Sequence, residues 1–202
     1  MQQPIVSRAS QKALACAQRS RSGMTIVELT IAMVIFTIAT ATMLQLVMSG
    51  QGLRRTAREE WLATSVAQNV LEQMRALPFE TICVHYDADP YNDPGGPGTS
   101  PGATFTVGNL DPTSADTDGF VGEVVLPMVN AGSAVAPDWQ LREDIGDPLL
   151  GIPRDLTGDA IVSSENHLSD YTVLPVLVRI RWRGAYGPRE LRFFVSFTQM
   201  QS

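Results

Sequence analysis

Glu28 is the residue whose chemistry is most narrowly defined by its surroundings in this sequence. It is the only charged residue in the apolar stretch from Met24 to Met48. A carboxylate in an apolar environment is costly unless it takes up a proton or pairs with a cation, so we expect Glu28 to have a partner. As a helix, residues 24–48 would be about 37 Å long, enough to cross a hydrocarbon core of about 30 Å with some tilt. We therefore predict a transmembrane or filament-core helix over this stretch.

A second pattern surrounds the start of that stretch. A basic leader ends at Gly23, a hydrophobic residue, Met24, follows, and Glu28 is the fifth residue counted from Met24. Over about residues 19–48 this pattern resembles type IV pilins and type II secretion pseudopilins. The resemblance implies that a prepilin peptidase cuts between Gly23 and Met24 and methylates the new N-terminus. Gln45 stands where many major type IV pilins carry proline, which favours the minor pilins and the pseudopilins.

The resemblance also implies a partner for Glu28. After cleavage, the α-ammonium of Met24 is a cation at nearly the same membrane depth as Glu28. Within one helix the ammonium points away along the axis, but the ammonium of a neighbouring subunit could pair with Glu28 and register the two subunits. The alternative is an ordinary signal anchor, in which Glu28 merely lies near the lipid headgroups.

Residues 1–23 have the composition of a cytoplasmic leader. They contain no acidic residue, and their basic residues are Arg8, Lys12, Arg19 and Arg21. Charge alone does not orient the span, because further arginines at 54, 55 and 58 follow it closely. The pilin resemblance implies that the N-terminus is cytoplasmic and that the head, residues 49–202, is periplasmic.

The charge balance argues against a nucleic-acid partner. The chain has 15 basic and 21 acidic residues, and the part after the leader keeps 11 basic residues, for a net charge of −10. One basic cluster is expected on the polar side of a C-terminal hairpin, formed by Arg179, Arg181, Arg183, Arg189 and Arg192. We interpret it as a solvated strand face that discourages edge-to-edge pairing of strands and balances the negative charge of the acidic loops. Binding of DNA or of an acidic partner is the alternative.

Few other residues suggest a metal site or catalysis. Asp155, Thr157 and Asp159 occupy alternate, ligand-like positions of a degenerate calcium loop, in which Ala160 replaces the turn glycine and Asn166 the bidentate acid. Calcium is therefore a hypothesis, and no other cofactor is expected.

The remaining candidates for chemistry are two histidines and one cysteine. His85 and His167 lie in loop-like segments without spaced metal ligands, and the chain has no nucleophile elbow or phosphate-binding loop, so we predict no enzyme. Once the leader is removed, Cys83 is the only cysteine, which excludes an internal disulfide. We expect Cys83 to be a small buried hydrophobic residue.

The predicted fold is α+β and pilin-like: a long N-terminal helix whose membrane-spanning half is followed by an amphipathic half packed on a small antiparallel sheet. The amphipathic half, residues 53–77, has apolar residues at helical spacing, including Val66, Val70 and Met74, and Pro78 ends it. Glycines at 50 and 52 predict a soft joint between the halves.

The strands are predicted from alternation of apolar and polar residues. Residues 172–199 should form a hairpin whose apolar face carries Val176, Val178, Ile180 and Trp182 from one strand and Leu191, Phe193, Val195 and Phe197 from the other. Shorter strands are expected at 103–107 and 120–128, with weak structure near 139–145.

These features favour a structural subunit, a minor pilin or pseudopilin, processed by prepilin peptidase in the inner membrane and assembled with other pilins. One alternative is a DNA-uptake or adhesion pilin whose head binds a ligand. The other is a signal-anchored periplasmic domain that joins no filament.

Overall fold

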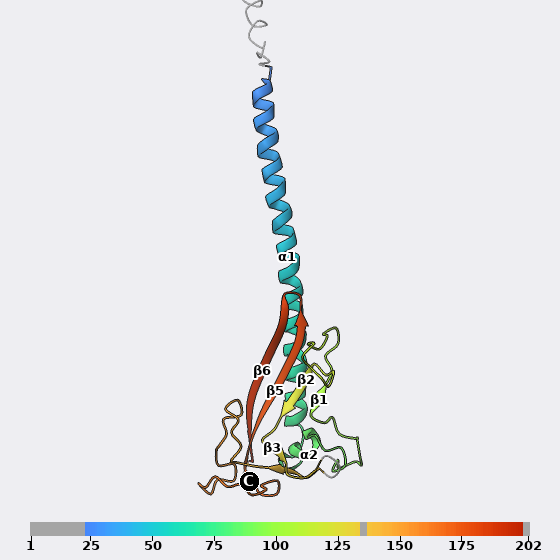
Figure 1. Cartoon of the computed structure of the whole chain (residues 1–202), viewed down its shortest axis with the longest axis vertical. Coiled ribbons are helices and arrows are strands. Elements are labelled where there is room, and N and C mark those ends of the chain that lie inside the picture. Colours follow the sequence, from blue (N-terminus) through green and yellow to red (C-terminus); the bar gives the residue numbers. More distant parts are fainter. Residues whose placement is uncertain (1–22, 134–136, 200–202) are drawn as a thin grey trace, which may run out of the picture. The chain divides into compact units, whose positions relative to one another are not determined.

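The N-terminal part of the molecule is a single long helix. The computed structural model describes residues 23–133 and 137–199, so the predicted leader lies almost wholly outside the described residues. Helix α1 runs from Ile26 to Arg75, 50 residues, without a break at Gly50 or Gly52 (Figure 1). The long helix is therefore confirmed. The predicted soft joint does not interrupt it, although the boundary between the two compact units of the chain falls at Gly50.

The described residues of the first unit, 1–50, expose almost every side chain. From residue 23 to residue 49 each one is exposed, and α1 is long and apolar enough, by length and composition, to cross a membrane. Its threonines do not leave polar groups unpaired, because their hydroxyls donate to helix carbonyls three or four residues back. These threonines are Thr30, Thr37, Thr40 and Thr42. Such internal bonding makes a hydroxyl compatible with an apolar environment.

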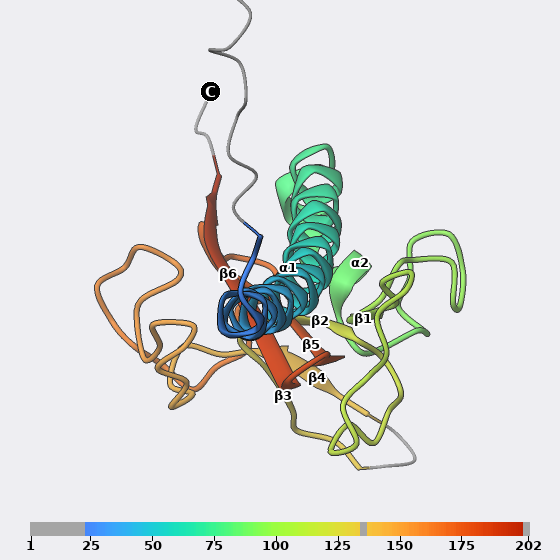
Figure 2. The same cartoon turned by 90° about the horizontal axis from the view of Figure 1, so that it is seen from above.

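The second unit, residues 51–202, is the head, and its main sheet is antiparallel. The strand order is β1-β2-β5-β6. The strands are β1 (Thr104–Phe105), β2 (Gly122–Val125), β5 (Val173–Gly184) and β6 (Gly187–Thr198). The predicted hairpin is confirmed: β5 and β6 pair from Val173↔Thr198 to Gly184↔Gly187 around a two-residue loop. The loop-rich segments 87–121 and 142–172 lie on opposite sides of this hairpin (Figures 1 and 2).

The strand predicted over 120–128 is divided between two sheets. After β2, the chain leaves the main sheet at Leu126 and Pro127 and continues as β3 (Met128–Asn130), which pairs with β4 (Trp139–Leu141). Proline has no N–H to donate to a strand ladder, so Pro127 marks the point where pairing with β5 stops. Two short helical segments, η1 (Phe79–Thr81) and α2 (Ile82–Tyr86), follow α1 beyond Pro78.

The core of the head lies between α1 and β5. The buried apolar residues of the helix are Ala63, Ala67, Val70, Leu71 and Met74, and they belong to the same cluster as Val176, Val178, Ile180 and Trp182 of β5. Ala63 and Ala67 are small and are both 0% exposed within this cluster. Val66 and the inward residues of β6 are only half-buried, because β6 is an edge strand.

The outer face of β5 is less polar than the alternation predicts. Leu177, which the sequence places on the arginine side of the strand, is buried against Leu150 and Ile152 in a second, smaller cluster. The segment 143–153 therefore covers this end of the sheet. Only the part of the face near Arg179 and Arg181 is lined with charge.

Candidate processing and assembly site

The predicted processing site lies just before α1 begins. Gly23, Met24 and Thr25 are not helical, and Gly23 has open space where a side chain would project. Met24 is 63% exposed. The bond between Gly23 and Met24 is therefore in exposed, non-helical chain, where a peptidase can reach it.

Thr25 begins the helix and orients its first turn. Its side-chain oxygen accepts the backbone N–H of Glu28 at 3.2 Å, which is the usual N-cap arrangement. The carboxylate of Glu28 therefore lies in the first helical turn, where the helix dipole favours negative charge. Within residues 23–133 and 137–199, Glu28 forms no ion pair.

Comparison with known proteins supports the class that this geometry suggests. Residues 18–44 match the prokaryotic N-terminal methylation motif, the signature of type IV pilins and pseudopilins. The single apolar helix that carries this motif fits an inner-membrane anchor. No curated protein and no solved structure matches the chain.

The predicted calcium residues lie in one loop of the head, where Asp155 already has several donors. Its carboxylate accepts the backbone N–H groups of Thr157, Gly158 and Ala160 at 2.9, 2.6 and 2.7 Å. These bonds, the one from Gly158 first, lower the pKa of Asp155. Asp159 accepts the N–H of Ile161. The side chain of Asp155 thus stabilises the turn in which it lies. The part of the chain that the structure describes contains no group of three His, Cys, Asp or Glu residues that could hold a metal. The calcium hypothesis stays a prediction.

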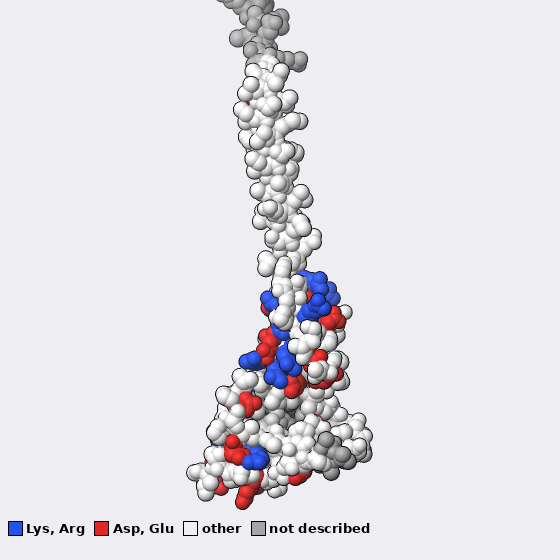
Figure 3. Space-filling view, viewed as in Figure 1, with Lys and Arg blue, Asp and Glu red and all other residues white. Residues whose placement is uncertain are grey.

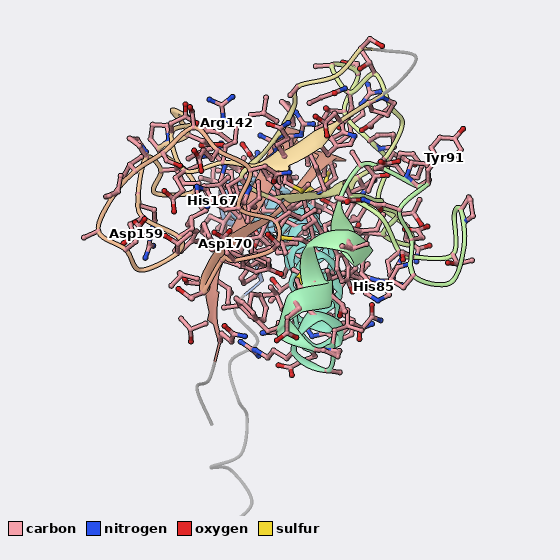
Figure 4. The ribbon with its side chains drawn as sticks, turned by 90° about the horizontal axis from the view of Figure 1, so that it is seen from below. His85, Tyr91, Arg142, Asp159, His167 and Asp170 are labelled. Atoms are coloured by element: carbon pink, nitrogen blue, oxygen red, sulfur yellow. The ribbon has the colours of Figure 1, made fainter. Side chains whose placement is uncertain are left out.

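A buried polar network that the sequence analysis missed lies beside this loop. Glu143 is fully buried, and its carboxylate accepts the N–H groups of Leu156 at 2.6 Å and Ser163 at 3.1 Å. The hydroxyl of Ser163 is 2.7 Å from Nε2 of His167, whose Nδ1 lies 3.2 Å from Asp170 (Figure 4). The sequence gives little indication of this network, because Glu143 and His167 are far apart along the chain and lie in segments without regular secondary structure.

The order of atoms from Ser163 through His167 to Asp170 is that of a nucleophilic triad. Two features indicate a holding role instead. The hydroxyl of Ser163 also accepts the N–H of Glu165, and the side chain of Asp170 is 58% exposed. Glu143 lies 3.8 Å from the imidazole nitrogen that faces Ser163. The network binds backbone N–H groups of residues 156–163 and thereby fixes the loop.

The arginines of the hairpin mostly face acids. Arg179 pairs with Glu123 at 2.6 Å, and Arg192 pairs with Glu190 at 2.7 Å. Arg189 pairs with Glu60 of α1. These three acids lie on β2, on β6 and on α1, and not on the acidic loops that the interpretation of the cluster expected.

Arg181 is the exception to the picture of a freely solvated face. It lies 3.3 Å from Asp116, whose side chain is only 3% exposed and whose Oδ2 has no hydrogen-bond partner among the described residues. The pKa of Asp116 is raised, mainly by a hydrogen bond with Asp118 and to a smaller extent by burial. The positive charge of Arg181 acts in the opposite direction and lowers this pKa. Arg181 therefore neutralises a buried carboxylate.

Proposed function

We propose that this chain is a structural subunit, a minor pilin or pseudopilin, of a bacterial type IV pilus or type II secretion filament. The observation that carries the proposal is the methylation motif at residues 18–44, with Gly23, Met24 and Glu28 at the expected spacing at the start of a long, exposed apolar helix. The N-terminus is cytoplasmic, the apolar half of α1 spans the inner membrane, and the head is periplasmic.

Processing prepares the chain for assembly. Prepilin peptidase hydrolyses the Gly23–Met24 bond, which leaves a carboxylate on Gly23 and an amino group on Met24. The amino group then takes a methyl group from a methyl-donor cosubstrate, whose bond to that methyl breaks, and gives up a proton. The ammonium of Met24 on a neighbouring subunit pairs with Glu28. Because each charge would otherwise be buried without a partner, the pair favours one axial position of the two subunits.

The role of the head is to present a surface at the outside of the filament. Its core is formed mainly by α1 and β5, and buried residues such as Val107, Leu156 and Tyr171 anchor the segments 87–121 and 142–172 to that core. The exposed parts of these two segments, on opposite sides of the hairpin, are the surface that the head presents. The favoured partners are other pilins.

Processing is tested by mass spectrometry of the protein extracted from membranes of cells with an active prepilin peptidase. The expected mature chain begins with N-methylated Met24. Gly23→Trp should leave the uncut precursor in the membrane, because a bulky side chain then occupies the position before the cut. A mature chain that keeps residues before Met24 would refute the proposed processing.

Assembly is tested with Glu28→Gln, which removes the charge and keeps the size of the side chain. We expect normal cleavage and membrane level but at least a tenfold loss of copurifying pilins. Thr30→Val is the matched control, since it also changes a polar side chain of the first turns and leaves the charge in place. Wild-type copurification by Glu28→Gln would show that the carboxylate does not register the subunits.

A further inference from the structure

One face of α1 within the head carries a basic stripe that the pilin signature, at residues 18–44, does not include. We use the name basic stripe for Arg54, Arg58 and Trp61. They are spaced four and three residues apart, so at 100° per residue they project within about 60° of one another. All three are exposed, Trp61 to 66%. The opposite side of the helix, at Gly52 and Glu59, faces the hairpin.

The two arginines of the basic stripe differ from their neighbours in having no acid to neutralise them. Arg55 pairs with Glu59 at 3.1 Å, and Arg189 of β6 pairs with Glu60. No ion pair involves Arg54 or Arg58 within residues 23–133 and 137–199. Figure 3 shows arginines gathered at the end of the head that contains residues 51–60. The basic stripe is thus an exposed positive surface on an acidic protein.

The arginines of the basic stripe follow the apolar half of α1 closely enough for their long side chains to reach back to a headgroup layer. Arg54 follows Met48 by six residues, or about 9 Å of helix, and Arg58 follows by about 15 Å. Helical side chains lean toward the N-terminus of their helix, so long arginines at these positions reach back toward the apolar half. Headgroup layers are about 5–8 Å thick on each side of the hydrocarbon core. Trp61 follows Met48 by 13 residues, or about 20 Å of helix, so it lies beyond such a layer and is not part of the proposed contact.

We propose that Arg54 and Arg58 bind the phosphate groups of anionic phospholipids in the membrane that anchors the chain. The guanidinium groups are suited to phosphate because they donate in a planar, forked geometry. This inference rests on the proposed function, since it requires the apolar half of α1 to span a membrane. Anionic lipid would hold the subunit at one depth until it leaves the bilayer for the filament.

A lipid headgroup fits better than an acidic partner protein for two reasons. The stripe continues directly from the apolar stretch of the same helix, so an anchored chain always has lipid beside it. The charged part of the stripe is also small, because it consists of two unpaired arginines about one helical turn apart. An area of this size suits a single phosphate headgroup better than the surface of a protein. An acidic surface of a neighbouring subunit is the other occupant, and the experiment below separates the two.

The test uses the processed chain, residues 24–202, in nanodiscs that contain equal amounts of phosphatidylcholine and phosphatidylglycerol. Native mass spectrometry then counts the lipids retained by the released protein. We expect a preference for phosphatidylglycerol on the order of tenfold, which Arg54→Gln/Arg58→Gln reduces to about twofold or less. The control Arg75→Gln/Arg154→Gln removes the same charge from arginines outside the stripe and should keep the preference. Thermal melting confirms that each variant is folded.

Three results would overturn the proposal. The wild-type chain could retain both lipids equally, or both double variants could lose the preference to the same extent, which would indicate net charge alone. Alternatively, Arg54→Gln/Arg58→Gln could keep the preference while losing copurifying pilins, which would assign the basic stripe to a subunit contact. The lipid measurement needs only a membrane-inserted chain. A chain that prefers phosphatidylglycerol but never copurifies with pilins would therefore refute the filament role and leave this inference intact.

Discussion

Helix α1 shows two ways in which one continuous helix can be stabilised. In residues 26–49 every side chain is exposed, and hydrogen bonds within the helix satisfy its threonine hydroxyls. In residues 59–74 six side chains are buried, and contacts with β5 hold the helix in the head. No other part of the described chain covers the first half of the helix, whereas the head itself covers the apolar face of the second half.

Two glutamates on this helix make the same comparison at the level of single residues. Glu59 is 8% exposed, and its carboxylate has two donors in the same chain. Arg55 donates to it at 3.1 Å, and the indole N–H of Trp182 donates at 3.4 Å. Glu28 has no such partner in the described residues. A carboxylate that folding has already paired is structural, whereas one left unpaired in an apolar stretch is available for another molecule.

The largest effect should come from placing a charge in the core of the head. Met74→Asp introduces a carboxylate at a position that is 0% exposed, at a cost of several kcal/mol out of roughly 5–15 kcal/mol of total stability. We expect the head to be unfolded at 25 °C by near-ultraviolet circular dichroism of the full chain in detergent. Leu53→Asp on the same helix is the control, since Leu53 is 70% exposed, and it should melt like wild type. Equal melting of the two variants would mean that α1 does not pack on the sheet.

A smaller loss should follow from Glu143→Gln. The amide places N–H donors where one carboxylate oxygen accepts backbone N–H groups, so we expect a loss of about 2–3 kcal/mol. Thermal unfolding measures it, and hydrogen exchange should show faster exchange of the N–H of Leu156 and Ser163. Glu165→Gln, an exposed residue of the same loop, should change stability by less than about 0.5 kcal/mol. Slow exchange at both amides in Glu143→Gln would contradict the holding role.

The arginine face of the hairpin should divide into two kinds of residue. Arg181→Ala leaves the carboxylate of Asp116 without its cation, and we expect a loss of about 1–2 kcal/mol. Arg192→Ala breaks an exposed pair and should cost about 0.5 kcal/mol or less. In a double-mutant cycle, Asp116→Asn should recover most of the loss caused by Arg181→Ala. If the two single arginine variants melt alike, the face is uniformly solvated after all.

The thiol of Cys83 should make the head sensitive to alkali. Burial raises its pKa to about 12, above the value of an unfolded cysteine. The unfolded chain therefore loses this proton first, so the contribution to stability is complete below about pH 8.5 and declines as the pH rises toward 12. We expect a loss of about 2 kcal/mol between pH 8 and pH 10, and Cys83→Ala should flatten the slope in that window. An equal slope in both proteins would exclude the thiol as the cause.

The smallest effect on the stability of the head is expected from a change in the N-terminal half of α1. Glu28→Gln should leave the melting temperature of the head unchanged, because no contact of Glu28 contributes to the core. The same preparation of protein used for copurification can be melted, so a loss of assembly is separated from a loss of folding. A shift of more than about 2 °C would show that the N-terminal half contributes to the stability of the head.

The amino-acid sequence by itself determined the features that depend on local order. The apolar stretch around Glu28, the Gly23–Met24 junction and the two-residue period of β5 and β6 are all legible because neighbours along the chain carry the pattern. The methylation motif confirms the first of these features as the signature of type IV pilins and pseudopilins. Local periodicity was also sufficient for the long helix, since its hydrogen bonds join residues only four positions apart.

Only the tertiary structure decided what covers each element and which charges meet. The Glu143 network joins residues 13 to 24 positions apart in irregular chain. The pair of Arg181 with Asp116 and the burial of Leu177 bring together still more distant segments. Gly52 is a similar case, because a Cβ there would lie 1.9 Å from the hydroxyl of Tyr186. Such contacts arise when loops without a period fold over a sheet, and no local pattern encodes them.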